Sequence, residues 1–184
     1  MKRNKILLTG ANGYIGKRLL EVLINMNFDV VCCVRDVMRF NLNDFESKHI
    51  TVIEVDLLNR ESLEKLPIDI DGAYYLVHSM SSNHNFDDLE RICALNFVSY
   101  LNQTTVKHVI YLSGIVNSLE LSKHLHSRKN VEDILAKGIY NFTCLRAGII
   151  IGSGSASFEI IRDLVEKLPV MITPKWLRTK CQPI

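Results

Sequence analysis

The sequence predicts an α/β fold, a doubly wound parallel sheet with helices on both faces. Short apolar runs, too short for helices, alternate along the chain with longer segments in which apolar residues recur at helical spacing. The first short run, residues 5–9, leads directly into three glycines spaced three residues apart, Gly10, Gly13 and Gly16. Regular alternation of this kind is typical of parallel strands joined by right-handed crossovers.

The glycine motif follows a strand and opens a helix, and this placement predicts a Rossmann-type nucleotide cradle. Gly10 lets the chain turn sharply off the strand, Gly13 lets the backbone approach a pyrophosphate, and Gly16 lets the helix sit close to the strand. The helix N-terminus adds free N–H groups and the positive end of the helix dipole. A structural loop without a ligand is the alternative that the motif alone leaves open.

Each element is predicted by its periodicity and by its boundaries. Strands are expected where apolar or β-branched residues run together, and helices where apolar residues recur on one face every 3.6 residues. Pro67, Gly138 and Pro169 mark helix ends because proline breaks the helical ladder and glycine favours a C-terminal cap. In chain order we expect a strand over residues 5–9, a helix over 14–25, a strand over 30–34, a short helix within 39–48, a strand over 50–55, a short helix over 60–66, a strand over 72–77, a helix over 86–103, a strand over 108–112, a helix over 127–136, a strand over 141–145 and a helix over 158–167.

Composition narrows the class of protein. The chain has 184 residues, 47% of them hydrophobic, and a net charge of +2, which suits one domain with one good core. Nucleic acid is not an expected partner, because no basic stripe interleaved with aromatic residues is present. The apolar stretch near the N-terminus is too short for a signal peptide or a membrane span, so we expect a cytoplasmic protein.

The cysteines predict free thiols in a reducing compartment. They are odd in number and lack CxxC spacing, so neither a disulfide framework nor a metal site is expected. Most of them fall in apolar runs, where a thiol behaves as a small hydrophobe. They are Cys32, Cys33, Cys93, Cys144 and Cys181.

The end of the chain bears on the expected domain organisation. Residues 1–184 are expected to form a single nucleotide-binding domain. Residues 170–184 stop without a capping or polar segment, so we expect a truncated C-terminal side, either a cut chain or a missing C-terminal domain.

The order of four motifs resembles the atypical short-chain dehydrogenase/reductase superfamily, on its NmrA-like, NAD(P)-binding side. The motifs are the segments Thr9–Gly16, Val34–Asp36, Val55–Leu57 and Tyr74–Met80. The segment Arg146–Trp176 is more specific and looks like the bacterial branch described as nucleoside-diphosphate-sugar epimerase-like. The resemblance covers essentially the whole chain, and in many such proteins a further domain follows the Rossmann domain.

The resemblance implies a set of cofactor-binding residues. The glycine motif would hold the pyrophosphate through Gly10, Asn12, Gly13, Tyr14, Ile15 and Gly16. The pair after the third strand, Asp56 and Leu57, would lie beside the adenine. The loop after the fourth strand would line the ribose on the nicotinamide side through Val77, His78 and Ser79.

Arg35 bears on the choice between NADP(H) and NAD(H). It stands at the end of the second strand, where an acidic residue would bind the ribose 2′-OH and an arginine would pair with a 2′-phosphate. Asp36 follows directly, so both readings have a candidate residue. We favour NADP(H), because the first residue past the strand is better placed to reach the ribose. A solvated loop arginine is the alternative.

The catalytic residues of the superfamily are not all present. Its reductases usually carry a tyrosine and, four residues on, a lysine that lowers the tyrosine pKa. Alignment on residues 132–135 places His124 at the tyrosine position and Arg128 at the lysine position. His124 as an acid or base, with Ser113 as the hydroxyl after the fifth strand, is therefore the candidate catalytic pair. A polar helix start at the rim of the pocket is the alternative.

The loop of residues 152–157 has two readings. Its small glycine and serine residues suit close approach to a ligand, and Ser157 suits an N-cap of the helix expected to begin near Phe158.

Together these observations predict an NADP(H)-binding protein, an oxidoreductase or epimerase-like enzyme with an unidentified small-molecule substrate. The missing tyrosine and lysine leave open a non-catalytic module that senses the nicotinamide pool. The abrupt end of the chain leaves open a scaffold that serves a missing partner domain.

Overall fold

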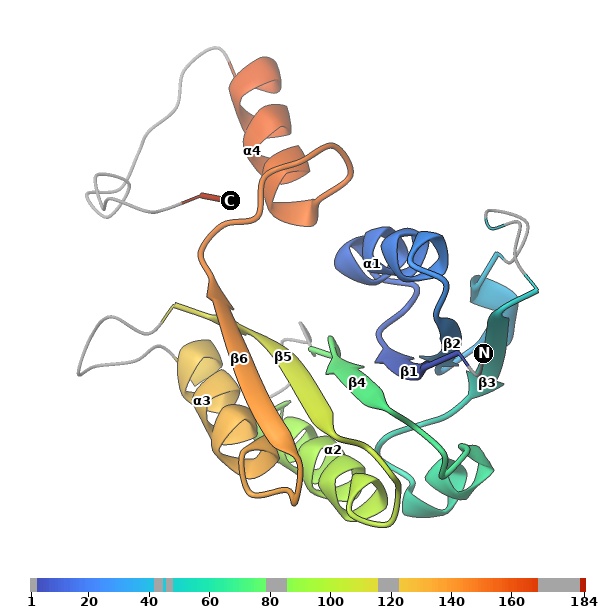
Figure 1. Cartoon of the computed structure of the whole chain (residues 1–184). Coiled ribbons are helices and arrows are strands. Elements are labelled where there is room, and N and C mark those ends of the chain that lie inside the picture. The colour runs from blue at the N-terminus through green and yellow to red at the C-terminus, as the bar shows by residue number, and fades with distance from the viewer. Residues whose placement is uncertain (1–2, 42–44, 46–47, 79–85, 116–122, 169–182) are drawn as a thin grey trace.

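A computed structural model describes residues 3–41, 45, 48–78, 86–115, 123–168 and 183–184 (Figure 1). It contains a six-stranded sheet in the order β3-β2-β1-β4-β5-β6, and every neighbouring pair is parallel. The predicted doubly wound parallel sheet is therefore confirmed. The strands are β1 Lys5–Thr9, β2 Asp29–Val34, β3 Ile50–Glu54, β4 Gly72–Tyr75, β5 His108–Gly114 and β6 Asn141–Ala147.

The strand order reverses between β1 and β4. The chain runs outward from β1 to β3 on one side and from β4 to β6 on the other. In open parallel sheets the ligand crevice lies beyond the carboxyl ends of the strands at such a reversal. The fold therefore places the candidate site where residues 9–13 leave β1 and residues 76–78 leave β4.

Helices cover both faces of the sheet and fill two separate cores. On one face α1 (Tyr14–Asn25) contributes Leu20 and Leu23, which pack with Leu8 of β1. On the other face η3 (Arg60–Lys65), α2 (Phe86–Leu101) and α3 (Lys123–Leu135) pack against the neighbouring β1 residue, Leu7. Alternate residues of β1 enter opposite cores because successive side chains of a strand point to opposite faces.

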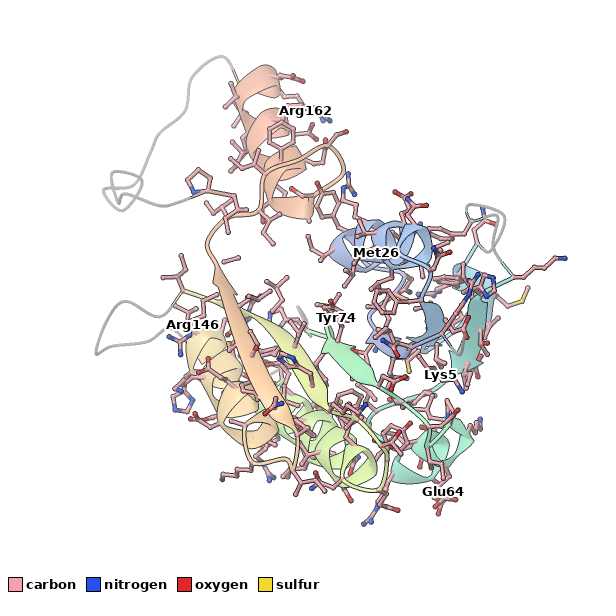
Figure 2. All side chains as sticks on the ribbon, in the orientation of Figure 1. Lys5, Met26, Glu64, Tyr74, Arg146 and Arg162 are labelled. Atoms are coloured by element: carbon pink, nitrogen blue, oxygen red, sulfur yellow. The ribbon has the colours of Figure 1, made fainter. Side chains whose placement is uncertain are left out.

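Helix α4 (Ala156–Lys167) stands apart from the strands, and Figure 2 shows its side chains, with Arg162 labelled. None of its residues is buried. Its N-cap is Ser155, whose Oγ accepts a hydrogen bond from Phe158 N at 3.2 Å. The predicted cap at Ser157 is wrong, because the helix begins two residues earlier than Phe158 and places Ser157 inside its first turn.

Other helix ends also differ from the sequence prediction. After β2 the chain forms a short helix, η1, at Val37–Arg39, where the carboxylate of Asp36 accepts a hydrogen bond from Met38 N and caps the helix. The short helix expected within residues 39–48 stays a prediction, because residues 42–44 and 46–47 lie outside the described residues. Helix α3 begins at Lys123, four residues before the predicted start.

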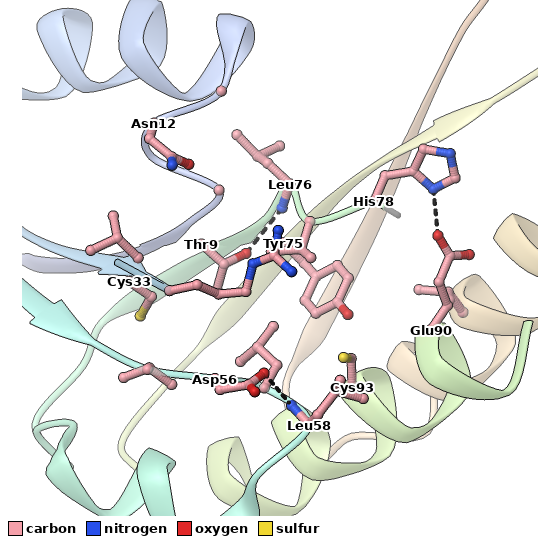
Figure 3. A pocket seen from close by; sticks show the side chains of 18 of the residues that line it. Thr9, Asn12, Cys33, Asp56, Leu58, Tyr75, Leu76, His78, Glu90 and Cys93 are labelled. Atoms are coloured by element: carbon pink, nitrogen blue, oxygen red, sulfur yellow. Dashed lines mark hydrogen bonds and ion pairs between the residues drawn. The ribbon is translucent and has the colours of Figure 1, made fainter. Parts of the chain in front are cut away.

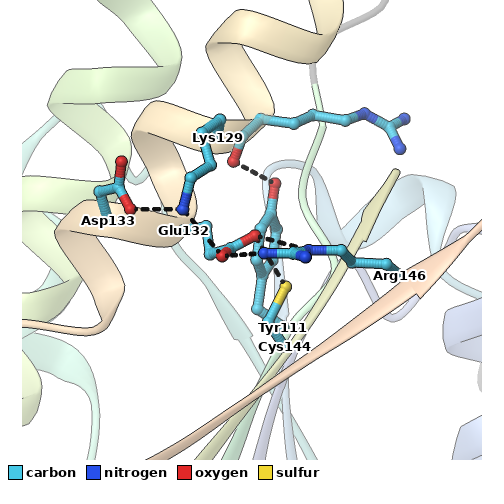
Figure 4. Close-up of polar contacts among 7 residues, drawn as sticks. Tyr111, Lys129, Glu132, Asp133, Cys144 and Arg146 are labelled. Carbon is cyan, nitrogen blue, oxygen red and sulfur yellow. Dashed lines mark hydrogen bonds and ion pairs between the residues drawn. The ribbon is translucent and has the colours of Figure 1, made fainter. Parts of the chain in front are cut away.

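Glu132 joins α3 to β6 (Figure 4). Its carboxylate accepts two hydrogen bonds from Arg146, at 2.6 and 3.3 Å, one from Cys144 Sγ at 3.2 Å and one from Lys129 Nζ at 3.1 Å. Burial by itself would raise the pKa of Glu132, but these hydrogen bonds outweigh it and lower the pKa to about 2. The carboxylate is therefore ionised and paired at neutral pH.

The cysteines within the described ranges, Cys32, Cys33, Cys93 and Cys144, are free thiols. Burial raises the pKa of all of them, to about 12 for Cys32 and to about 11 for Cys93 and Cys144, so the thiols stay protonated. Cys181 lies outside the described residues. Among the residues that the structure describes, no group of His, Cys, Asp and Glu side chains is placed to hold a metal ion. In the same part of the chain, no helix is both long enough and apolar enough to cross a membrane.

Candidate cofactor site

The turn after β1 has the geometry that its glycines predict. Gly10 has φ +69°, in the left-handed region, and a Cβ there would lie 2.9 Å from the carbonyl oxygen of Leu76. Gly13 N donates to the carbonyl oxygen of Gly10 at 3.0 Å and closes the turn. At Gly16 a Cβ would lie 2.1 Å from the same oxygen, so α1 packs directly on the turn. The predicted conformational roles of Gly10 and Gly16 are confirmed.

Thr9 fixes the two strand ends that flank the reversal. Its side chain is fully buried, and its Oγ1 donates to the carbonyl oxygen of Tyr74 and accepts from Leu76 N, both at 3.1 Å. The chain leaving β1 is thereby held against the chain leaving β4, as Figure 3 shows for Thr9 and Leu76. The role of Thr9 could not be read from the sequence, because a threonine at a strand end is an ordinary strand residue until its neighbour is known.

A cavity of about 610 Å³ opens at these strand ends (Figure 3). It extends from the loops after β2 and β3, past the glycine turn, to the chain after β4 and the adjoining side of α2. Eight of the predicted cofactor residues line it: Gly10, Asn12, Gly13, Arg35, Asp56, Leu57, Val77 and His78.

The remaining predicted cofactor residues do not line the cavity or are not described. The first turn of α1, which follows the glycine turn and does not line the cavity, contains Tyr14, Ile15 and Gly16. The ring of Tyr14 lies under the guanidinium of Arg18 at 3.8 Å instead. Ser79 lies outside the described residues.

The loop after β3 is held in place by a hydrogen bond within its own turn and by side-chain contacts from α2. The Asp56 carboxylate accepts from Leu58 N at 3.0 Å, which shapes the turn. From α2, Asn96 Nδ2 donates to the carbonyl oxygens of Leu57 and Leu58 at 2.9 and 3.2 Å. Asn96 was not identified from the sequence, because its role depends on which helix packs under this loop.

The structure places neither Ser113 nor His124 on the cavity wall. Ser113 is 1% exposed, and its Oγ makes no hydrogen bond to any residue that the structure describes. His124 is exposed at the start of α3, where its ring stacks on Phe86 with centroids 4.7 Å apart and lies 6.5 Å from the ring of His78. The pairing of His124 with Ser113 stays a prediction.

Glu90 is a site residue that sequence reasoning missed. It lines the cavity from α2, is 7% exposed, and lies 2.6 Å from His78 Nδ1 through Oε1. Its other carboxylate oxygen accepts a hydrogen bond from the buried Ser127 of α3. The sequence does contain a signal for a buried carboxylate. Glu90 lies four residues from Phe86 and four from Ala94, so it interrupts the apolar face of α2.

Known proteins share this fold. The chain is 16% identical to the Bordetella bronchiseptica enzyme WbmH, solved in complex with NAD⁺, over 90% of this chain and 63% of that one, with a TM-score of 0.75. For a nucleoside-diphosphate-sugar epimerase from Staphylococcus aureus the identity is 19%, over 89% of this chain and 55% of that one, with a TM-score of 0.71.

Sequence comparisons add the family. The ketoreductase adrE of Penicillium rubens is 23% identical over 125 residues, which are 61% of this chain and 37% of that protein. The chain thus spans less than two thirds of the length of each of these relatives. A family model described as NAD(P)H-binding matches residues 10–163, from the glycine turn into α4. The match takes in the whole wall of the cavity beyond Thr9, and the chain belongs to this NAD(P)H-binding family, with a pyridine nucleotide as its cofactor.

Proposed function

We propose that the protein binds NAD(P)H across the carboxyl ends of β1 to β4 and acts as an oxidoreductase or epimerase-like enzyme on a small molecule. The observation that carries this proposal is the cavity of about 610 Å³ at the strand-order reversal, walled by the glycine turn. Ketoreductase and epimerase are the activities named for two of the similar proteins. The bound nicotinamide would supply or accept the hydride.

The residues of the cavity wall favour one orientation of a bound dinucleotide. Arg35 and Asp56 line one part of the cavity and suit the adenosine half. Gly10 and Gly13 leave the backbone of the turn open to the pyrophosphate, because neither carries a Cβ that would stand in the way. The nicotinamide half would then extend toward His78, on the other side of the turn.

Titration of the purified protein with NADPH and NADH, followed by nucleotide fluorescence, tests the proposal. We expect saturable binding of at least one coenzyme, with competition by the oxidised form, since all forms share the pyrophosphate that the turn would hold. Absence of binding for both coenzymes in folded protein would contradict the proposal.

NADP(H) is the preferred form within this proposal. Asp36, the acidic candidate for a ribose 2′-OH, has one carboxylate oxygen on Met38 N at 2.9 Å and the other 3.2 Å from Arg39 Nε. Its side chain therefore serves the local turn. Arg35 lines the cavity with an exposed side chain, so its guanidinium is accessible to a 2′-phosphate.

An Arg35→Ala change is expected to weaken NADPH binding about tenfold or more and NADH binding less than about threefold. The reason is that a charge-assisted pair with phosphate contributes roughly 1.5–3 kcal/mol, whereas NADH has no phosphate at this position. Lys65→Ala, which removes the same charge from the exposed end of η3, is the matched control and should leave both affinities unchanged. Equal losses for the two coenzymes in the Arg35 variant would contradict the assignment.

We also propose a cytoplasmic location, in line with the free thiols of the described cysteines.

A further inference from the structure

A carboxylate, that of Glu90, is buried in the wall of the cavity. Glu90 is 7% exposed, and its two oxygens are engaged by His78 and Ser127. A buried carboxylate is costly unless it is paired and hydrogen-bonded. The contact between His78 and Glu90 therefore contributes to the packing of α2 against the chain after β4. The imidazole and its proton take part in that packing.

The contact with Glu90 also fixes how the His78 ring is presented. Nδ1 lies 2.6 Å from the carboxylate, and the side chain, 22% exposed, lines the cavity (Figure 3). Nε2 makes no hydrogen bond to any residue within the described ranges. When one ring nitrogen is held by a carboxylate, the other is the nitrogen that exchanges protons with a ligand. His78 thus has the arrangement of a proton-transferring histidine, with its orienting carboxylate behind it.

The neutral groups around the pair do not compete for this role. Burial raises the pKa of Tyr75 well above its ordinary value, that of Tyr111 to about 12 and that of Cys93 to about 11. The Glu90 carboxylate adds to the rise in all three. These side chains therefore stay protonated and uncharged between pH 5 and 8.

Among the residues that the structure describes, the charged groups nearby come from three other elements. From α3, Arg128 lies near Tyr111 and His124 lies with its ring 6.5 Å from that of His78. From the loops after β2 and β3, Arg35 and Asp56 face Cys93. Arginine keeps its charge throughout this pH range, so within the described ranges His124 is the neighbour whose charge could be confused with that of His78.

We propose that His78 is the proton donor and acceptor of this pocket, on its nicotinamide side, and that Glu90 and Ser127 are its positioning residues. The inference rests on the proposed function. In carbonyl reduction the reduced coenzyme would supply the hydride for the new C–H bond, and the carbonyl oxygen would take the proton from Nε2 of the protonated ring. The products are the alcohol, oxidised coenzyme and a neutral ring, which solvent reprotonates. In the reverse direction neutral Nε2 would accept the alcohol proton while the oxidised coenzyme takes the hydride from the carbon.

The proposal is tested by binding, without a substrate. NADP⁺ carries a positive nicotinamide ring and NADPH a neutral one, so a proton on His78 disfavours only NADP⁺. We expect the ratio of the dissociation constants, NADP⁺ over NADPH, to rise on the order of tenfold from pH 8 to pH 5. Titration of the 2′-phosphate is common to both forms and cancels in the ratio. The measurement is calorimetric or fluorescence titration at each pH.

Two variants assign the effect to the pair. In His78→Gln the ratio should become nearly independent of pH. In Glu90→Gln the ratio should be higher than in the wild type already at pH 8, because the negative charge near the nicotinamide is gone. Thermal melts of both variants show whether they are folded, and each variant tests the pair without the other.

The matched controls are two other histidines. His49 forms the same kind of pair, with Asp29 at 2.9 Å, but at the amino ends of β2 and β3, away from the cavity. His49→Gln and His124→Gln should both keep the wild-type pH dependence. Loss of that dependence in His124→Gln, or its persistence in His78→Gln, overturns the proposal. A flat ratio in a wild type that binds both coenzymes overturns this inference alone, whereas failure to bind either overturns the proposed function.

Discussion

A Gly16→Ala change is expected to lower NADPH affinity about 100-fold or more and to destabilise the protein by roughly 2–3 kcal/mol. Glycine to alanine inside a helix is ordinarily favourable by about 1 kcal/mol, so a loss here would run against helix propensity. The new Cβ would lie 2.1 Å from the carbonyl oxygen of Gly10 and 2.8 Å from Ala11 Cα. Both contacts are with backbone, so α1 must move off the turn that would hold the pyrophosphate.

Gly154→Ala is the matched control for this change. Gly154 has φ +85°, which costs an alanine about 1 kcal/mol, but a Cβ there meets only the Tyr14 ring, at 3.8 Å. We expect that variant to lose about that much stability and to bind NADPH within twofold of the wild type. Urea unfolding and fluorescence titration measure the two effects. Wild-type affinity in Gly16→Ala would show that the close packing of α1 on the turn is not needed for binding.

The glycine turn could be predicted because everything that determines it is local. A strand, a positive φ at Gly10 and a close approach at Gly16 are consequences of a few consecutive residues. The strand order then follows from general rules for parallel sheets, and it brings Arg35 and Asp56 to the same cavity. Residues that directly follow parallel strands can therefore be predicted from the sequence to share a site, even when they lie far apart in the chain.

The pair of His78 and Glu90 could not be predicted with the same certainty. One residue follows a strand, but the other lies on a helix, and their contact depends on the rotation of α2 and its height along the sheet. Periodicity gives the buried face of α2 but not the residue opposite each position on it. Ser127, from α3, adds a third element to the contact, so the arrangement is purely tertiary.

The capping residues of two helices were not predicted for a related reason. Ser155 and Ser157 are both good N-caps by residue type, and only the hydrogen bond to Phe158 N selects Ser155. Asp36 likewise reads as a cofactor ligand until its carboxylate is seen to cap η1. In each case residue type allowed more than one interpretation. The structure shows that the side chain accepts a hydrogen bond from a backbone N–H.

A Glu132→Gln change is expected to destabilise the protein by about 2 kcal/mol at pH 7. The carboxylate is 7% exposed and joins α3 to β6 through Arg146. Its folded pKa, about 2, lies below the ordinary value of 4.5, so the ionised form is favoured by folding. The full shift would correspond to about 3 kcal/mol, which we reduce because Arg146 and Lys129 are partly exposed and regain water in the variant.

The pH dependence of this loss has a defined sign. Because the folded pKa is depressed, the stabilisation is fully present above about pH 4.5 and is lost as the pH falls toward 2. The difference between wild type and Glu132→Gln should therefore shrink by about half near pH 3. Denaturant unfolding at pH 7, 4 and 3 measures it.

Asp133→Asn is the matched control, since Asp133 pairs with the same Lys129 at 2.8 Å but has a side chain that is 56% exposed. Exposed ion pairs contribute little, so that variant should lose less than about 0.5 kcal/mol at every pH. A Glu132→Gln loss equal to the control, or one that grows toward acid, would contradict the role of a buried ionised carboxylate. Because Glu132 lies on the element that carries Ser127, loss of the link between α3 and β6 should also loosen the support of Glu90. Glu132→Gln should then change the pH dependence of coenzyme discrimination as well, whereas Asp133→Asn should not.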